Sequence, residues 1–260
     1  MHRVPGEGRI RNILRPAFTV RLPRLARLVE LAVFPSFCKT CGTLLDAPRD
    51  RVMCRACLDK LAPHRGPSCP SCGRFFEGEG DDHLCGTCLE SPPPFSLHRS
   101  AGRYRGLLKD AVLLLKYRSS RPLGPELGRF AHDTLKGEEG LWWGTSAVVP
   151  VPLHSRRRRE RGFNQAEVAA GEVARLAGLP LERKALIKVR NTAAQTSLEQ
   201  ADRAINVKGA YAVAAPVRLR GKALLLVDDV YTTGATLREC ASALKKAGAK
   251  DVRALTIAQA

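Results

Sequence analysis

Aromatic residues are scarce in this sequence: they make up 5% of its 260 residues, and only two are tryptophan. The chain also lacks an apolar run near the ~20 residues with which a helix crosses a bilayer. Its apolar early segment, residues 25–34, is short and is interrupted by Arg27 and Glu30, and no small-residue cleavage site follows it. The pattern argues against a membrane span and an export signal, and we expect a cytoplasmic protein.

Acidic residues are also few, with 25 Asp and Glu against 43 Lys and Arg, which gives a net charge of +18. The excess is uneven: the net charge is +5 in residues 1–35, −1 in residues 36–98 and +14 in residues 99–260. We interpret residues 1–35 as a basic lead-in segment with an amphipathic helix over residues 22–33. Because the middle segment is not basic, we interpret it first as a scaffold or protein-contact module and second as a nucleic-acid-binding module. We expect a polyanionic substrate, nucleic acid or both to bind the larger domain.

Eight of the nine cysteines form four C-x-x-C pairs, and the first two pairs map onto the last two by a shift of 31 residues. Gly42 and Gly73 follow the leading pair of each repeat. Four thiolates match one tetrahedral Zn²⁺, and segments with little core of their own take much of their folding energy from the metal. We therefore predict a double zinc-ribbon module over residues 36–90 with two structural zinc ions. The predicted ligands are Cys38, Cys41, Cys54, Cys57, Cys69, Cys72, Cys85 and Cys88.

A disulfide framework is the alternative for these cysteines, but it requires an oxidising compartment, and no export signal is present. The spacing leaves open whether each repeat closes its own zinc site or whether the pairs interleave. The ninth cysteine, Cys240, stands alone in a helical pattern, and we expect it to be a small buried residue.

Beyond a proline-rich linker at residues 91–95, strand and helix patterns alternate. The expected helices are residues 104–116, 123–135, 165–177 and 237–247, and the expected strands are residues 147–151, 185–189, 211–214, 222–227 and 252–258. Such alternation with short loops predicts an α/β domain over residues 96–260, with a parallel sheet covered on both faces. Ligands of such sheets bind beyond the carboxyl ends of the strands.

The most informative stretch is Leu224–Thr236, which reads LLLVDDVYTTGAT. An apolar run ends in Asp228 and Asp229, and a Thr/Gly loop then leads into a helical pattern. Free backbone N–H groups and the helix dipole favour a phosphate at such a loop. The carboxylates are suited to sugar hydroxyls or to a hydrated Mg²⁺. The stretch therefore predicts a site for a phosphorylated sugar with a metal; the alternative is an ordinary strand-to-helix loop with a threonine cap.

A second candidate loop, residues 149–166, follows the strand predicted at 147–151 and contains five arginines within residues 156–161. Guanidinium groups bind phosphate oxygens in pairs. The alternative is a solvated basic loop, but the position at a strand tip favours a binding role.

The string LLLVDDVYTTGAT resembles the 5-phosphoribosyl-1-pyrophosphate (PRPP) signature of type I phosphoribosyltransferases. The resemblance implies that Asp228 and Asp229 hold the ribose. It implies that the 5′-phosphate binds Thr232, Thr233, Gly234, Ala235 and Thr236. It also implies a pyrophosphate subsite along the backbone of residues 153–156, including Arg156, with Arg161, Asn164 and Gln165 beside it. Residues 191–206, with Gln195 and Arg203, fall where these enzymes have a mobile loop.

The doubled C-x-x-C region, followed by YRGLLKDAVLLLKY, PVPLHSRRRRERGFNQA, QTSLEQADRAIN and the Asp-Asp loop, is similar to the ComF competence-protein family. The similarity covers the chain from about residue 34 onwards. It implies a parallel-sheet type I phosphoribosyltransferase fold preceded by a small zinc-ribbon module built from two four-cysteine repeats. It also implies a role in taking up single-stranded DNA during natural transformation, together with other DNA-uptake proteins.

Three functions compete on these residues. The first is a phosphoribosyltransferase with an unknown acceptor, in which Mg²⁺ and arginines balance the charge of the leaving pyrophosphate. The second is a DNA-handling factor that binds PRPP without turnover. The third, an amidophosphoribosyltransferase, is disfavoured because it needs an activated thiol nucleophile, whereas the first cysteine, Cys38, belongs to a C-x-x-C pair. We favour a PRPP-binding, phosphoribosyltransferase-like protein of the competence type that supports DNA uptake; the residues favour pentosyl transfer but leave turnover open. The alternative is an enzyme of nucleotide metabolism with a small-molecule acceptor.

Overall fold

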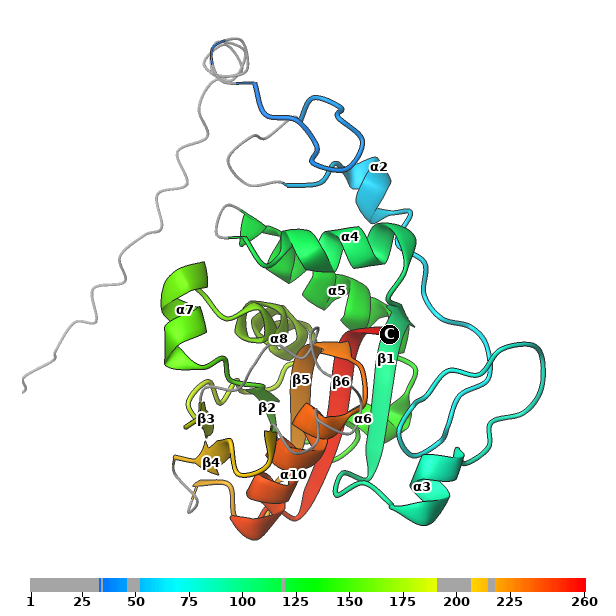
Figure 1. Ribbon diagram of the computed structural model, residues 1–260, viewed down its shortest axis with the longest axis vertical. Coiled ribbons are helices and arrows are strands. Elements are labelled where there is room, and N and C mark those ends of the chain that lie inside the picture. The colour runs from blue at the N-terminus through cyan, green and yellow to red at the C-terminus, as the bar shows by residue number, and fades with distance from the viewer. Residues whose placement is uncertain (1–32, 34, 46–51, 118–119, 191–206, 215–217) are drawn as a thin grey trace, which may run out of the picture. The chain divides into compact units, whose positions relative to one another are not determined.

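The structure is a computed structural model, shown in Figure 1. It describes residues 33, 35–45, 52–117, 120–190, 207–214 and 218–260. The chain divides into two compact units, Met1–Pro35 and Ser36–Ala260. The helix predicted over residues 22–33, apart from Val33, and the mobile loop predicted at residues 191–206 lie outside the described residues.

The helices and strands of the second unit follow the predicted alternation closely. The helices are α2 (Arg55–Leu58), α3 (Gly86–Glu90), α4 (Gly106–Leu114), α5 (Leu123–Leu135), α6 (Glu139–Trp142), α7 (Ser155–Arg161), α8 (Gln165–Leu176) and α10 (Ala235–Lys246). The strands are β1 (Leu97–Arg103), β2 (Ala147–Pro150), β3 (Leu186–Lys188), β4 (Tyr211–Val213), β5 (Ala223–Tyr231) and β6 (Asp251–Gln259). No helix in the described part of the chain combines the length and apolarity that crossing a membrane requires.

Four parallel strands in the order β1-β6-β5-β2 form the main sheet, which confirms the predicted parallel α/β architecture. Both faces of β5 are covered: Leu225 and Val227 pack in one core cluster with residues of α4, α5 and α8, and Leu224 and Leu226 pack in another with α10. Successive side chains of a strand point to opposite faces. Burial on both faces therefore explains the continuous apolar run at residues 223–227.

The strands differ from the predicted ones in three places. Strand β1 at the sheet edge is not predicted by the sequence, because its buried positions include the polar residues His98 and Ser100 and give no apolar alternation. Strands β3 and β4 were expected, but they pair with each other antiparallel in a separate two-stranded sheet. Strand β5 continues to Tyr231, since its ladder with β6 extends to the pair Tyr231↔Gln259. The carboxylate pair thus lies within the last part of the strand instead of after it.

The two cysteine repeats adopt the same local structure. In each, a short antiparallel bridge, Phe37↔Leu44 or Ser68↔Phe75, frames the first C-x-x-C pair. The glycine after that pair has a positive φ and closes the turn through its N–H, which donates to the carbonyl of the first cysteine at 2.8–2.9 Å. The second pair opens a short helix, with Cys54 or Cys85 as its N-cap. The internal repeat of the sequence is therefore also a structural repeat.

Candidate functional site

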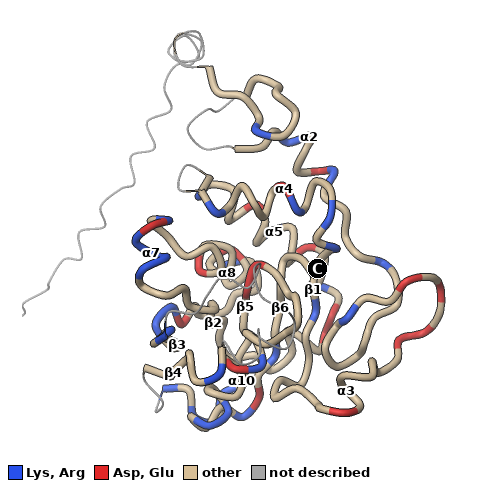
Figure 2. Tube along the Cα trace, viewed as in Figure 1, with Lys and Arg blue, Asp and Glu red and all other residues tan. Residues whose placement is uncertain are grey.

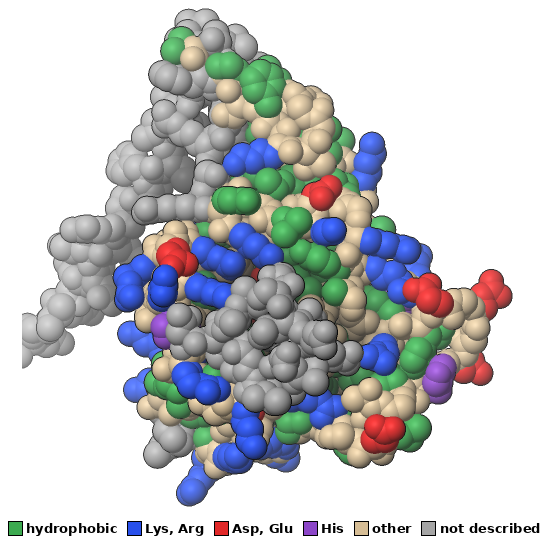
Figure 3. Space-filling view, in the orientation of Figure 1, with side chains coloured by type: hydrophobic (Ala, Val, Ile, Leu, Met, Phe, Trp, Pro, Cys, Tyr) green, Lys and Arg blue, Asp and Glu red, His purple; other side chains and the backbone are tan. Residues whose placement is uncertain are grey.

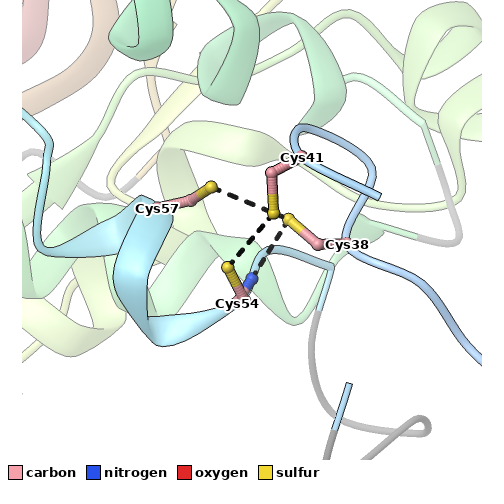
Figure 4. A group of neighbouring side chains, drawn as sticks. All are labelled: Cys38, Cys41, Cys54 and Cys57. Carbon is pink, nitrogen blue, oxygen red and sulfur yellow. Dashed lines mark hydrogen bonds between the residues drawn. The ribbon is translucent and has the colours of Figure 1, made fainter. Parts of the chain in front are cut away.

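Each cysteine repeat closes its own four-thiol site, which resolves the pairing that the spacing leaves open. Cys38, Cys41, Cys54 and Cys57 form one group and Cys69, Cys72, Cys85 and Cys88 the other, and the sulfur atoms within a group lie within 4.8 Å of one another. Figure 4 shows the sulfur atoms of the first group pointing toward a common centre, two from the start of α2 and two from the preceding loop.

The sulfur separations fit a tetrahedral zinc ion. With Zn–S bonds of ~2.3 Å, the edges of the tetrahedron are ~3.8 Å, and the Sγ atoms are 3.9 Å apart for Cys38 and Cys57, 3.5 Å for Cys41 and Cys54, and 3.6 Å for Cys72 and Cys85. Backbone N–H groups point at the ligands: the N–H of Cys54 donates to the Sγ of Cys38 at 3.3 Å, and such donors orient metal-binding sulfur atoms. No disulfide forms among the described cysteines.

The four thiols of the first site cannot all ionise without a cation. Burial, reinforced by the neighbouring cysteines, raises the pKa of Cys57 to about 12. In contrast, hydrogen bonding with Thr43 lowers the pKa of Cys41 to about 6. A divalent metal removes this conflict because it stabilises all four thiolates together.

The second zinc ribbon contacts the carboxyl end of the main sheet directly. The ring of His98 on β1 hydrogen-bonds through Nδ1 to the carbonyl of Cys72 at 2.7 Å and stacks on the ring of Tyr231, with centroids 4.3 Å apart. Gln259, at the end of β6, donates to the carbonyl of Gly73 at 3.0 Å and accepts from the N–H of Phe75 at 2.7 Å. The ribbon is therefore bonded to the strand ends where the sequence predicts the ligand site.

The carboxylate pair lies near the end of β5. Asp228 is half-buried and accepts a bond from the N–H of Asp229 at 2.9 Å, and Asp229 accepts from the N–H of Val230 at 2.8 Å. Burial raises the pKa of Asp228 well above its usual range, and the charge and side-chain hydrogen bond of Asp229 raise it further, while the backbone N–H of Asp229 and the charge of Lys188 oppose the shift. Hydroxyl donors or a divalent cation would relieve this repulsion, so the pair fits both a ribose and Mg²⁺.

The loop after β5 presents an uncapped helix end. Gly234, with φ +76°, is the N-cap of α10 and has no side chain to bond the first turn, while Thr233 Oγ1 accepts from the N–H of Ala235 at 3.4 Å. The first turn of a helix and its dipole favour an anion at such a position. A Cβ at Gly234 would lie 2.5 Å from the Tyr231 hydroxyl, so the loop has room only for glycine there.

The arginine-rich segment is a helix, not the loop that the sequence predicts. His154 caps it by accepting the N–H of Arg156 at 3.3 Å, and Gly162 ends it with φ +80°. Consecutive arginines therefore point in different directions: Arg156 pairs with Glu160 at 3.2 Å in solvent, whereas Arg161 is partly buried within the field of Asp229. Burial lowers the pKa of Arg161 and Asp229 raises it, so burial dominates.

The two amides that follow α7 have different environments. Asn164 is buried and donates to the carbonyl of Val151 at 2.9 Å, which fixes the turn after β2. Gln165 is also buried, with 3% of its surface exposed, yet its Nε2 has no hydrogen-bond partner. A buried amide donor without a partner is costly, and a ligand oxygen would satisfy it.

Lys188 and Tyr211, at the ends of β3 and β4, are not among the site residues that the sequence predicts. The ammonium of Lys188 lies 5.2 Å from the centre of the Tyr211 ring. Its pKa is lowered by burial and by Arg157, and raised by Asp228. Burial raises the pKa of Tyr211, while a hydrogen bond with Thr236 opposes the shift. Neither residue belongs to a motif, and the only cue in the sequence is a cation at the end of a weak strand.

Comparisons with known families match both parts of this architecture. A double zinc ribbon domain matches residues 30–89, and a phosphoribosyl transferase domain matches residues 164–260. The structure and these matches define the class: a protein with a double zinc ribbon joined to a phosphoribosyltransferase domain.

Curated relatives identify the family. DNA utilization protein YhgH of Salmonella typhimurium is 32% identical over 167 residues, which are 63% of this chain and 72% of that protein. Competence protein F of Haemophilus influenzae is 34% identical over 115 residues, 44% of this chain and half of that protein. Competence protein ComFC of Streptococcus pneumoniae is 29% identical over 163 residues, 62% of this chain and 67% of that protein. The chain belongs to the ComF competence-protein family.

Among solved structures, the allosteric regulatory enzyme of purine biosynthesis is similar over 53% of this chain and 26% of its own, with 22% identity and a TM-score of 0.35. A hypoxanthine phosphoribosyltransferase from Staphylococcus aureus is similar over 57% of this chain and 62% of its own, with 14% identity and a TM-score of 0.27. Both similarities are too distant to bear on function.

Proposed function

We propose that the chain binds PRPP with Mg²⁺ at the carboxyl end of β5 and uses it in the handling of DNA. The observation that carries the proposal is the juxtaposition of a mutually repelling carboxylate pair, Asp228 and Asp229, with the N-terminus of α10, where Gly234 is the N-cap. The pair suits hydroxyls and a divalent cation, and the helix end suits a phosphate. PRPP carries hydroxyls, a phosphate and a metal-binding pyrophosphate on one pentose.

The proposed contacts divide among the surrounding elements. The 5′-phosphate lies on residues 232–236, and the ribose hydroxyls lie on the carboxylates. The pyrophosphate faces Arg161, together with Lys188 and the unpartnered amide of Gln165, whose positions support this side of the site. When bound, Mg²⁺ balances the charge of the pyrophosphate and favours its departure.

We infer a role in DNA utilisation or uptake from the names of the relatives, competence protein F, ComFC and DNA utilization protein YhgH. The net charge of +14 in residues 99–260 suits a polyanion. Figure 2 shows Lys and Arg spread over many elements of this part. We place the protein in the cytoplasm, because clusters of free thiols persist in a reducing compartment. We also infer a zinc module over residues 36–90 and a phosphoribosyltransferase domain over residues 96–260, with residues 1–35 as a lead-in segment.

Calorimetric titration of PRPP in the presence of Mg²⁺ tests the first step. The wild type is expected to bind, and Asp229→Asn is expected to bind at least about tenfold more weakly, because a hydrogen bond to a charged acceptor contributes ~1.5–3 kcal/mol. Asp133→Asn, an exposed substitution of the same chemistry on α5, is the matched control. Absence of a binding heat for the wild type would overturn the proposal. A screen for pyrophosphate release with candidate acceptors then separates transfer from binding without turnover.

A further inference from the structure

Two adjoining cavities lie between the zinc ribbons and the β1–α4 turn. The first has a volume of about 360 Å³ and is lined by Lys60, His64 and Arg65 on one side and by residues 103–108 on the other. The second has a volume of about 350 Å³ and reaches from residues 74–77 to Thr232 in the loop after β5. The two cavities share Arg103 and Arg105, and together we call them the ribbon cleft. Each is in the size range of small-molecule sites.

The ribbon cleft is strongly basic. Its lining includes the cations Lys60, Arg65, Arg74, Arg103 and Arg105 but one acid, Glu77, which already pairs with Arg103 at 2.7 Å. Arg74 and Arg105 are exposed, and neither forms an ion pair with another described residue. Figure 3 shows Lys and Arg side chains at the right of the view, next to acidic side chains. Uncompensated guanidinium groups in a cleft attract anions.

One wall of the cleft is held rigidly. The Phe75 ring stacks on the ring of His64 with centroids 3.6 Å apart, and the Arg103 guanidinium lies 5.5 Å from the centre of the Phe75 ring. Arg103 also donates to the carbonyl of Phe76 at 2.7 Å. These contacts fix Arg103 as part of the wall. Of the remaining cations, Arg74 and Arg105 are the ones that line the second cavity together with Thr232, where they can bind a ligand.

The cleft also contains an aromatic surface close to the carboxylate pair. Tyr104, half-buried at the end of β1, lines the second cavity. Burial raises its pKa, and the charges of Asp229 and Asp110 raise it further, which places its phenol within the field of the pair. An aromatic ring beside cations is the combination with which proteins hold a nucleobase and its phosphate.

We propose that the ribbon cleft is a second ligand site, for a nucleoside phosphate, with the phosphate on Arg74 and Arg105 and the base on Tyr104. The ligand would lie next to PRPP. The biological role of this second site therefore rests on the proposed function, whereas the experiment below does not depend on PRPP binding. A free mononucleotide and one unit of a single strand have the same chemistry and remain to be distinguished.

The test is competition by fluorescence anisotropy, with a labelled short oligothymidylate as the probe. Thymidine 5′-monophosphate is expected to compete, and thymidine is not, because it lacks the phosphate. Arg74→Glu/Arg105→Glu is expected to weaken probe binding by about tenfold or more and to reduce the slope of log affinity against log salt by about 0.7, the value for one phosphate contact on a single strand. Tyr104→Leu is expected to weaken binding by about tenfold while leaving the salt slope unchanged.

The matched control is Lys136→Glu/Lys246→Glu, which changes the net charge equally at positions outside the cleft lining. Equal losses in the two double variants, or equal competition by thymidine, would overturn the proposal. An oligothymidylate that binds more than about tenfold tighter than the monophosphate identifies a strand as the ligand, and similar affinities identify a mononucleotide; both results support the site. Calorimetry with PRPP on the same variants separates the two proposals, because PRPP binding should persist in Arg74→Glu/Arg105→Glu.

Discussion

A single methyl group at Gly73 should reveal whether the second zinc ribbon supports the proposed PRPP loop. Gly73 has φ +64°, and a Cβ there would lie 2.4 Å from the carbonyl oxygen of His98. Gly42, its counterpart in the first ribbon, has φ +74°, and such a Cβ would have no described atom within 4 Å. The left-handed conformation costs ~1–2 kcal/mol in both alanine variants. Gly73→Ala must also displace backbone, for ~1–3 kcal/mol more.

The His98 backbone that Gly73→Ala would displace is connected to the proposed ligand site through packed side chains. His98 stacks on Tyr231, whose hydroxyl lies under Gly234 of the phosphate loop, and Arg238 of α10 donates to the carbonyls of Ser91 and Pro92 just after the ribbon. We expect Gly73→Ala to weaken binding of PRPP with Mg²⁺ by about tenfold or more, since each ~1.4 kcal/mol of strain that acts on the bound state changes the dissociation constant about tenfold. We expect Gly42→Ala to stay within about twofold.

Calorimetry measures these affinities, and thermal unfolding measures the underlying strain at about 2–4 °C per kcal/mol. Zinc content, measured in parallel, shows that both ribbons remain loaded. If Gly73→Ala lowers the unfolding temperature more than Gly42→Ala but binds PRPP like the wild type, the second ribbon is only a scaffold and the reasoning is refuted.

Three further predictions follow from the two sites. Native mass spectrometry should find two zinc ions per chain and one in Cys41→Ser; a single ion in the wild type would contradict closure within each repeat. Gly234→Ala should weaken PRPP binding at least about tenfold, because its Cβ meets the Tyr231 hydroxyl at 2.5 Å; calorimetry with unchanged affinity would argue against the loop as the phosphate site. Asp228→Asn should raise the unfolding temperature at neutral pH while weakening PRPP binding. Because the native pKa of Asp228 is raised, the folded protein favours the protonated side chain. The contribution of Asp228 to folding stability is therefore fully present below the unfolded-state pKa of ~3.9 and is lost as pH rises through the native pKa. The advantage of the Asn variant should therefore grow with pH from about 4 upward, and a constant difference across that range would be inconsistent with the shift.

Local patterns predicted the parts of the fold whose signals are local. The helix at residues 123–135 has the predicted bounds, because its apolar face repeats with the helical period. The central strand was clear because it is buried on both faces. Strand β1 was not predicted because its buried positions include His98 and Ser100. These two side chains hydrogen-bond to Thr256 Oγ1, through His98 Nε2 at 3.0 Å and Ser100 Oγ at 2.6 Å, and buried polar residues give no hydrophobic pattern.

The site divides in the same way. The carboxylates and the Thr/Gly loop are contiguous in the chain, so their joint meaning is legible from sequence. The different environments of the arginines could not be predicted from sequence, because a helix was not expected there. Little more than one turn of that helix separates the solvent-facing Arg156 from Arg161, which lies in the field of Asp229. Lys188 lies on a strand of the two-stranded sheet and interacts electrostatically with Asp228. No spacing rule in the sequence connects these two residues.

The sequence by itself determined eight thiol ligands for two zinc ions, the parallel sheet and the strand that carries paired aspartates, because each depends on residues close together in the chain. Only the tertiary structure decided which cysteines share a metal, that the second ribbon bonds to the strand ends, and that its edge encloses a basic cleft beside Thr232. Those features depend on contacts between segments far apart in sequence, such as Gly73 and Gln259, and such contacts are set by packing and leave no periodic trace in the sequence.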